Sequence, residues 1–363
     1  MESTDALSIL SAEGFTTPLG PTRPPARRRV DSVDDIFSRL RQGDRGALSR
    51  AITLVESARE SDQVLASELL DRALPLTGLS VRVGITGSPG VGKSTLIEAL
   101  GMHIVGQGKK LAVLTVDPSS PSTHGSILGD KSRMAELSAH PNAYIRPSPS
   151  GCRLGGVANQ TREAIQMCEA ARFDVVFIET VGVGQSEIEV RNMVDCFLLL
   201  ALSGAGDELQ GIKRGIMEMA DVIGLTKADG DNRLRAEVAA GQIERALMLL
   251  PPDPMGRRAK VQLCSAKDRT GIDTIWESIS QFVEEDKANG RFDWRRGNQA
   301  VTWMEELVHQ SLLAAWLRRE DIKQATESLA DAVRELRTTP RSAANHLLGI
   351  VQTDLRSKSI RFE

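Results

Sequence analysis

Residues 87–95 read Gly87-Ser88-Pro89-Gly90-Val91-Gly92-Lys93-Ser94-Thr95, which matches the spacing G-x-x-x-x-G-K-S. Glycines at these positions let the backbone curl, so that successive N–H groups point at phosphate oxygens. The lysine reaches the β- and γ-phosphates, and the hydroxyl of Ser94 can ligate Mg²⁺. The positive end of the helix that follows attracts the same anion. The stretch therefore predicts a phosphate-binding loop for a nucleoside triphosphate.

The flanking sequence supplies the strand and the helix that such a loop requires. Residues 81–86 alternate as in a strand, and residues 94–105 place Leu96, Ile97 and Leu100 on one helical face. Further strands are predicted at residues 111–116, 142–147, 173–179, 195–201, 221–226 and 260–264. Strands that alternate with helices predict an α/β fold, in which a mostly parallel twisted sheet carries helices on both faces.

We expect the chain to be organised in four segments. Residues 1–30 are rich in proline and arginine and are predicted to form a disordered tail. Residues 31–80 form a helical segment, and residues 81–290 form the nucleotide-binding domain. Residues 291–363 form a helical arm whose apolar stripes need either the core or a second subunit as a partner. In the arm we expect helices at 301–319 and 320–336, an interruption at Pro340 and a short helix through Leu348.

Composition excludes several classes of protein. The 363 residues are 41% hydrophobic and 26% charged, which is ordinary for a soluble globular chain. The net charge of −3 gives no indication of nucleic acid or of an anionic membrane as a partner. The longest apolar run, residues 197–202, is too short to span a bilayer. We therefore expect neither nucleic-acid nor membrane binding.

The cysteines and the N-terminus indicate the compartment. The four cysteines, which lack C-x-x-C spacing, are Cys152, Cys168, Cys196 and Cys264. This scatter is typical of a reducing compartment and argues against a disulfide framework. The N-terminus carries acidic residues and no basic-then-apolar signal pattern, so a cytoplasmic location is the default, although residues 27–29 keep a mitochondrial presequence open.

Acidic residues at predicted strand ends indicate a magnesium site. Asp117 follows the strand at 111–116 and can hold Mg²⁺ directly or through water, with helix capping as the alternative. Asp130 lies in the polar loop 123–131 and is a candidate Mg²⁺-linked or water-orienting carboxylate. Glu179 begins the turn to Gly182, which has the form of a γ-phosphate sensor. Glu179 would bind a Mg²⁺-bound water, and the N–H of Gly182 would contact the γ-phosphate.

The residue that usually orients the attacking water is missing from this turn. Small signalling GTPases place a glutamine directly after the sensing glycine, whereas this chain has Val183. Another group must orient the water, and we expect slow intrinsic turnover. Gln185 is nearby in the sequence.

The loop 203–215 contains four glycines and charges of both signs, including Lys213. This lysine can stabilise developing phosphate charge, or it can be withheld until a partner orders the loop. A solvated charged loop is the alternative.

Two short elements are predicted to read the base. They are Thr226-Lys227-Ala228-Asp229 and Ser265-Ala266-Lys267, each at a predicted strand end. The Asp229 carboxylate can accept from guanine N1–H and the 2-amino group together, and adenine lacks this donor pair. A wrong base would leave the carboxylate unpaired at a cost of roughly 1–3 kcal/mol or more. Thr226 stands where asparagine is usual, and we expect this change to weaken the tethering of the phosphate loop.

Taken together, these motifs resemble those of the MeaB/ArgK/MMAA-type GTPases. The resemblance covers about residues 31–348. It rests on residues 43–45 (Gly-Asp-Arg), 51–57, 87–95, 116–120 (Val-Asp-Pro-Ser-Ser), 125–131, 140–142 (His-Pro-Asn), 146–151, 179–186 and 204–215. Departures from the family pattern are Thr226 and the pair Cys152-Arg153.

The resemblance implies a GTPase chaperone of an adenosylcobalamin-dependent acyl-CoA mutase of the methylmalonyl-CoA mutase kind. Such proteins gate cofactor loading from an adenosyltransferase, help to protect or reactivate the mutase, and form homodimers through their C-terminal helices. By the same matching Ser94, Asp117, Asp130 and Glu179 hold Mg²⁺. The implied catalytic residues are Lys93, Asp130, Glu179, Asp207 and Lys213, and the last two belong to the loop through which the mutase stimulates hydrolysis.

The expected cofactors are GTP or GDP and Mg²⁺. No D-x-H-x-x-G pattern for cobalamin occurs, so the chain should act on a cobalamin enzyme without holding the cofactor. A metallochaperone GTPase is an alternative, but the five histidines are isolated from one another and from the cysteines. An ATP-dependent kinase or a non-catalytic nucleotide-binding scaffold are further alternatives. The identity of the client mutase stays open.

Overall fold

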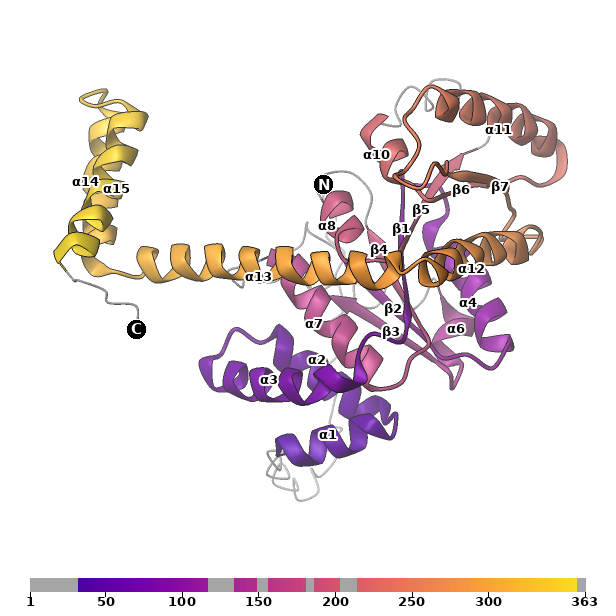
Figure 1. The fold of residues 1–363 in the computed structure, drawn as a ribbon, viewed down its shortest axis with the longest axis horizontal. Helices are drawn as coiled ribbons and strands as arrows, with labels where there is room; N and C mark the ends of the chain where they lie inside the picture. The colour runs from indigo at the N-terminus through magenta and orange to yellow at the C-terminus, as the bar shows by residue number, and fades with distance from the viewer. Residues whose placement is uncertain (1–31, 117–133, 149–155, 181–185, 203–213, 358–363) are drawn as a thin grey trace, which may run out of the picture. The chain divides into compact units, whose positions relative to one another are not determined.

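Parallel strands form one sheet in the computed structural model, which describes residues 32–116, 134–148, 156–180, 186–202 and 214–357 (Figure 1). Within these residues the strands are β1 (Val81–Gly87), β2 (Leu111–Val116), β3 (Ala143–Ser148), β4 (Val175–Thr180), β5 (Cys196–Leu202), β6 (Val222–Thr226) and β7 (Lys260–Leu263). Their order is β3-β2-β4-β1-β5-β6-β7, and all pairings are parallel. The predicted parallel α/β fold is confirmed.

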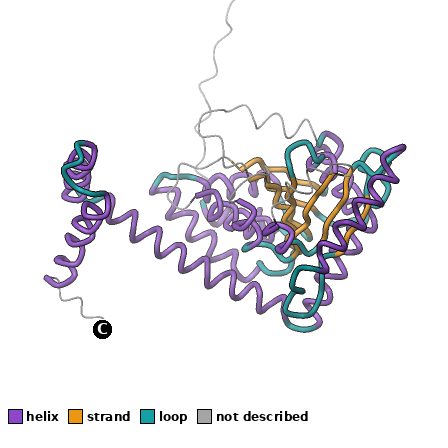
Figure 2. The backbone as a smooth tube through the Cα atoms, turned by 90° about the horizontal axis from the view of Figure 1, so that it is seen from above, coloured by secondary structure: helices purple, strands orange, loops and turns teal. Residues whose placement is uncertain are grey.

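Helices cover both faces of this sheet (Figures 1 and 2). Side chains alternate along a strand. In β4, Val175 and Phe177 pack in the apolar cluster of α4 (Lys93–Gly106), α6 (Ala135–Ala139) and α12 (Ile272–Ala288). The alternate residues of the same strand, Val176 and Ile178, lie on the opposite face of the sheet. There they pack with α7 (Gly156–Ala170) and α8 (Ser186–Arg191). Two further helices, α10 (Arg214–Met219) and α11 (Arg233–Met248), lie beside β5, β6 and β7.

The N-terminal helices pack on the α7 side of the sheet. They are α1 (Val33–Arg41), α2 (Arg45–Glu56) and α3 (Glu60–Ala73), followed by the 3-10 turn η1 (Leu74–Leu76). The predicted turn at residues 43–44 is present. Asp44 caps α2 by accepting from the backbone N–H groups of Gly46 at 2.7 Å and Ala47 at 3.0 Å. These bonds, together with Arg39, hold the pKa of Asp44 below its usual range.

The C-terminal helices begin and end differently from the prediction. They are α13 (Arg291–Leu317), α14 (Glu320–Arg334) and α15 (Pro340–Ser357). We expected the first to begin at 301, but ion pairing makes a polar stretch helical ten residues earlier. Arg295 pairs with Asp286 at 2.5 Å, and Arg296 pairs with Asp195 at 2.6 Å. Pro340 begins α15, where its missing N–H is harmless, instead of interrupting a helix.

The carboxyl ends of the strands meet at one edge of the sheet, where ligands of such sheets bind. Ile85 of β1 lies beside Glu179 of β4, and Thr180 donates a buried hydrogen bond to Thr86 at 2.8 Å. Thr226 ends β6, which pairs with β5 and is therefore separated from β4 by β1 and β5. No helix in the described part of the chain has the length and apolar character needed to cross a membrane.

Candidate functional site

The phosphate loop occupies the turn between β1 and α4. Gly90 and Gly92 have φ angles of 81° and 97°, in the left-handed region where a side chain would strain the backbone. Between them the side chain of Val91 is fully buried, and its N–H bonds the carbonyl of Ser88 at 3.2 Å. The loop is therefore anchored in the core by one apolar residue, while the glycines on either side shape its curve.

Lys93 folds back over the loop. Its Nζ donates to the carbonyl of Gly87 at 2.7 Å and to that of Ser88 at 3.2 Å. Burial lowers the pKa of this ammonium group, and the negative charges of Glu179 and Glu187 oppose that shift. The lysine therefore lies across the mouth of the loop, in position to meet phosphate oxygens.

Two of the four predicted magnesium ligands meet in the structure. Ser94, in the first turn of α4, donates from Oγ to Oε1 of Glu179 at 3.2 Å. Glu179 is only 5% exposed. Hydroxyl and carboxylate oxygens are the hard ligands that Mg²⁺ prefers, so the two residues fit this ion. The other two, Asp117 and Asp130, lie outside the described residues.

The two elements that are predicted to read the base come together beside the phosphate loop. Asp229 accepts from the hydroxyl of Ser265 at 2.7 Å, which links the segments that follow β6 and β7. Lys227 donates from Nζ to the carbonyl of Gly90 at 3.0 Å. Ala266 and Lys267 lie within the turn that Ser265 and Thr270 close through two backbone hydrogen bonds of 2.9 and 3.1 Å. The structure therefore brings the two elements into contact.

Thr226, where we expected a weaker tether, does bond to the phosphate loop. Its buried Oγ1 lies 2.7 Å from the carbonyl oxygen of Val91, to which it donates. The carbonyl oxygen of Ala201 is a second, longer acceptor at 3.3 Å. A threonine hydroxyl is a donor, as an asparagine amide is, and the β-branched side chain suits the end of a strand. The end of β6 is therefore tied to the phosphate loop through a threonine hydroxyl.

Replacing Thr226 with valine should weaken GTP and GDP binding to a similar extent. The change keeps the shape but leaves the buried carbonyl of Val91 without this donor, at a cost of about 1–3 kcal/mol, or roughly 5- to 150-fold in affinity. Titration with a fluorescent nucleotide measures the effect, and Thr226→Asn is the matched control because its amide can still donate. Unchanged affinity in the valine variant would rule out the tether.

Several predicted residues cannot be located, and one was missed. Gly182, Asp207 and Lys213 lie outside the described residues, as does Gln185. The missed residue is Glu187, in the first turn of α8, which is 2% exposed and acts electrostatically on Lys93. The available signal in the sequence was an acidic residue eight positions after Glu179, at the start of an amphipathic stretch.

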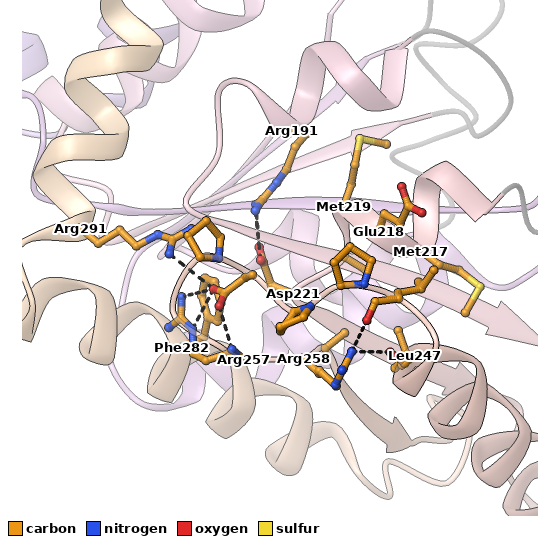
Figure 3. Close-up of a pocket in the computed structure, with 17 residues that line it drawn as sticks. Arg191, Met217, Glu218, Met219, Asp221, Leu247, Arg257, Arg258, Phe282 and Arg291 are labelled. Carbon is orange, nitrogen blue, oxygen red and sulfur yellow. Dashed lines mark hydrogen bonds and ion pairs between the residues drawn. The ribbon is translucent and has the colours of Figure 1, made fainter.

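A cavity of about 350 Å³ opens at the opposite edge of the sheet (Figure 3). Asp221, which precedes β6, lines it together with several arginines. These arginines are already engaged: Arg191 with Asp221 at 2.6 Å, Arg257 with Asp253 at 2.9 Å, and Arg258 with the carbonyl of Leu247 at 2.7 Å. Because its charges are satisfied internally and the phosphate loop is at the other edge, this cavity is not the nucleotide site.

Comparison with known proteins places this geometry in context. The sequence model of the family described as "Methylmalonyl Co-A mutase-associated GTPase MeaB" matches residues 48–321. The chain is 45% identical to GTPase ArgK of Escherichia coli over 322 residues, which cover 89% of this chain and 97% of that protein. It is 43% identical over 326 residues to the Mus musculus protein named methylmalonic aciduria type A homolog, mitochondrial, covering 87% of this chain and 79% of that protein.

A crystal structure shows the same similarity in three dimensions. The protein described as LAO/AO transport system kinase superposes with a TM-score of 0.70 at 38% identity, over 88% of this chain and 97% of that one. The similarity therefore extends over the sheet, the phosphate loop and flanking helices.

Proposed function

Since the chain belongs to the MeaB family of methylmalonyl-CoA mutase-associated GTPases, we propose that it is a GTP-driven chaperone of an adenosylcobalamin-dependent acyl-CoA mutase. The chain is a GTPase and binds GTP and GDP. In the proposed role it gates cofactor loading into a mutase of the methylmalonyl-CoA mutase type and takes part in protecting or reactivating that enzyme. A cobalamin adenosyltransferase supplies the cofactor, and the cytoplasm is the proposed compartment.

The observation that carries this proposal is the hydrogen bond between Ser94 and Glu179. Ser94 belongs to the helix that follows the phosphate loop, and Glu179 stands one residue before the end of β4. A change at this contact on nucleotide binding or hydrolysis passes directly to the chain that leaves β4. Such coupling between the phosphates and another segment of the chain is what a nucleotide-gated chaperone needs.

Mg²⁺ is the proposed second cofactor. Ser94 and Glu179 would hold it, together with Asp117 and Asp130, which the family resemblance assigns. When bound, the ion neutralises charge on the β- and γ-phosphates. Of this chain's own groups, Lys93 binds the same phosphates and Thr226 keeps the loop in register with the base-reading residues.

A homodimer through the C-terminal helices is part of the proposal. The inner face of α13 is fixed to the core: Arg162 pairs with Glu306, and Asn159 donates to Gln310 at 2.5 Å. The opposite face presents an exposed apolar stripe at helical spacing, formed by Trp294, Val301, Met304, Val308 and Leu312. A second copy of the same helix is the occupant we propose, because a helix with one docked and one apolar face fits a self-complementary interface.

Replacing Leu312 with glutamate should convert the dimer into a monomer. Leu312 is 65% exposed in the single chain, and a charge there would be buried without a partner in the interface. Light scattering coupled to gel filtration measures the mass. Leu234→Glu on α11 is the matched control, because Leu234 is 74% exposed and lies off the stripe. A dimer that survives Leu312→Glu would remove this face from the interface.

The proposal is tested by GTP turnover, with ATP as the control, in the presence and absence of purified cobalamin-dependent acyl-CoA mutases. We expect slow turnover of GTP alone, which rises strongly with the client mutase. Lack of any response to mutases that do load cofactor would contradict the chaperone role. Equal use of ATP would favour a kinase, and stoichiometric binding of a transition-metal ion without nucleotide would favour a metallochaperone.

Replacing Lys213 with alanine should spare nucleotide binding and intrinsic hydrolysis but remove stimulation by the mutase. The family resemblance places this lysine in the loop through which the partner acts, where its charge can stabilise the transferring phosphate only once the loop is ordered. We expect stimulated turnover to fall roughly 100-fold toward the intrinsic rate. Lys267→Ala, in the base-reading turn, is the contrasting variant, since it should weaken binding instead. Full stimulation of Lys213→Ala would exclude the loop.

A further inference from the structure

Buried carboxylates in this chain are generally paired with arginines. Glu169 accepts from Arg82 at 2.8 Å, and Asp195 accepts from Arg296 at 2.6 Å. Asp286 is bound by two arginines at the end of α12. Pairing of this kind is what allows a charge to stay ionised away from water.

Glu187 departs from this pattern. It is 2% exposed, yet its Oε2 has no hydrogen-bond partner among the residues that the structure describes. It lies in the first turn of α8, while its neighbours on the same helix, Ile188 and Glu189, are exposed. A buried carboxylate oxygen without a hydrogen-bond partner is retained where a ligand supplies the missing contact or where function requires it.

The helix that carries Glu187 packs on β1, the strand that leads into the phosphate loop. Val190 of α8 packs so tightly on β1 that a Cβ at Gly84 would lie 2.9 Å from its Cγ1. Gly84 stands three residues before Gly87, the first residue of the loop. The charge of Glu187 acts on the ammonium group of Lys93 together with that of Glu179. The charges of two carboxylates therefore act on the lysine of the phosphate loop, and only Glu179 is assigned.

We propose that Glu187 is a catalytic residue of GTP hydrolysis, which accepts a hydrogen bond from the attacking water and aims it at the γ-phosphorus. The water oxygen forms a bond to phosphorus, the bond from phosphorus to the β–γ bridging oxygen breaks, and GDP leaves. The water proton ends on the released phosphate. The chain has Val183 where a water-orienting glutamine is usual, and valine has no acceptor to offer.

This assignment rests on GTP hydrolysis and not on the identity of the client, so it is tested on the full-length chain alone. Single-turnover hydrolysis of saturating GTP is measured for Glu187→Ala and Glu187→Gln, with GTP and GDP affinities determined in parallel. We expect the alanine variant to be slower by roughly 100-fold, with both affinities kept within about 3-fold. The glutamine variant should keep a rate within about 10-fold of the parent, since an amide oxygen also accepts from water.

Glu189→Ala is the matched control on the same helix and should leave the rate unchanged, because this side chain is exposed. If Glu187 were only a counter-charge for Lys93, the two variants would behave differently. Both would then bind nucleotide more tightly than the parent, and both would hydrolyse it at the parent rate. That result would overturn the proposal, as would equal slowing of the alanine and glutamine variants. Retained nucleotide affinity shows in each case that the variant is folded.

Discussion

Replacing Lys93 with alanine should abolish tight GTP binding. The ammonium group lies over the loop, bonded to the carbonyls of Gly87 and Ser88, and it is the residue placed to meet the β- and γ-phosphates. Charge-assisted hydrogen bonds contribute about 1.5–3 kcal/mol each, so the loss of two should weaken GTP binding by at least roughly 100-fold. Titration with a fluorescent GTP analogue measures the loss, and thermal unfolding without nucleotide shows whether the variant is folded.

Lys260→Ala is the matched control for this experiment. Lys260 begins β7 at the opposite edge of the sheet, where its Nζ donates to Gln281 at 2.7 Å. Its removal changes the net charge equally, so any loss of affinity through charge alone would appear in both variants. Full GTP affinity in Lys93→Ala would contradict the assignment of residues 87–95 as the phosphate-binding loop.

The sequence predicted the sheet well because its central strands are largely apolar. Every residue of β2 and β4 is buried, and short apolar runs of this length bounded by turn residues favour buried strands. The start of α13 was not predictable in this way. Arg295 and Arg296 look like surface residues in the sequence, and only the fold brings Asp286 and Asp195 to them.

The candidate site was predictable where a motif fixes both residue type and spacing. The contacts of Lys93, Ser94 and Asp229 follow from their motifs, since each motif sits at the end of a strand. The roles of Thr226 and Glu187 needed the structure. A hydroxyl that tethers a loop through the carbonyl of Val91 is a property of two segments far apart in the chain. Burial of the Glu187 carboxylate depends on how closely α8 packs on β1.

Replacing Asp229 with asparagine should change the base that the site accepts. The carboxylate is held by the hydroxyl of Ser265 at 2.7 Å, with both oxygens suited to accept from guanine N1–H and the 2-amino group. Asparagine keeps one acceptor and replaces the other with a donor. We expect GTP affinity to fall by roughly 100-fold or more, because the 2-amino group then faces an N–H donor.

The same substitution should increase the affinity for xanthosine triphosphate. Xanthine presents N1–H and a 2-oxo group, which match the oxygen and the NH₂ of an asparagine side chain. Competition titrations with GTP, XTP and ATP measure the exchange. Asp231→Asn, two residues further on and exposed, is the matched control and should leave guanine preference intact. If Asp229→Asn kept its preference for GTP over XTP, the base would have to be read by another residue. A fall in GTP affinity together with a rise in XTP affinity would assign base selection to this carboxylate. Simple destabilisation of the site would instead lower the affinities for GTP and XTP together.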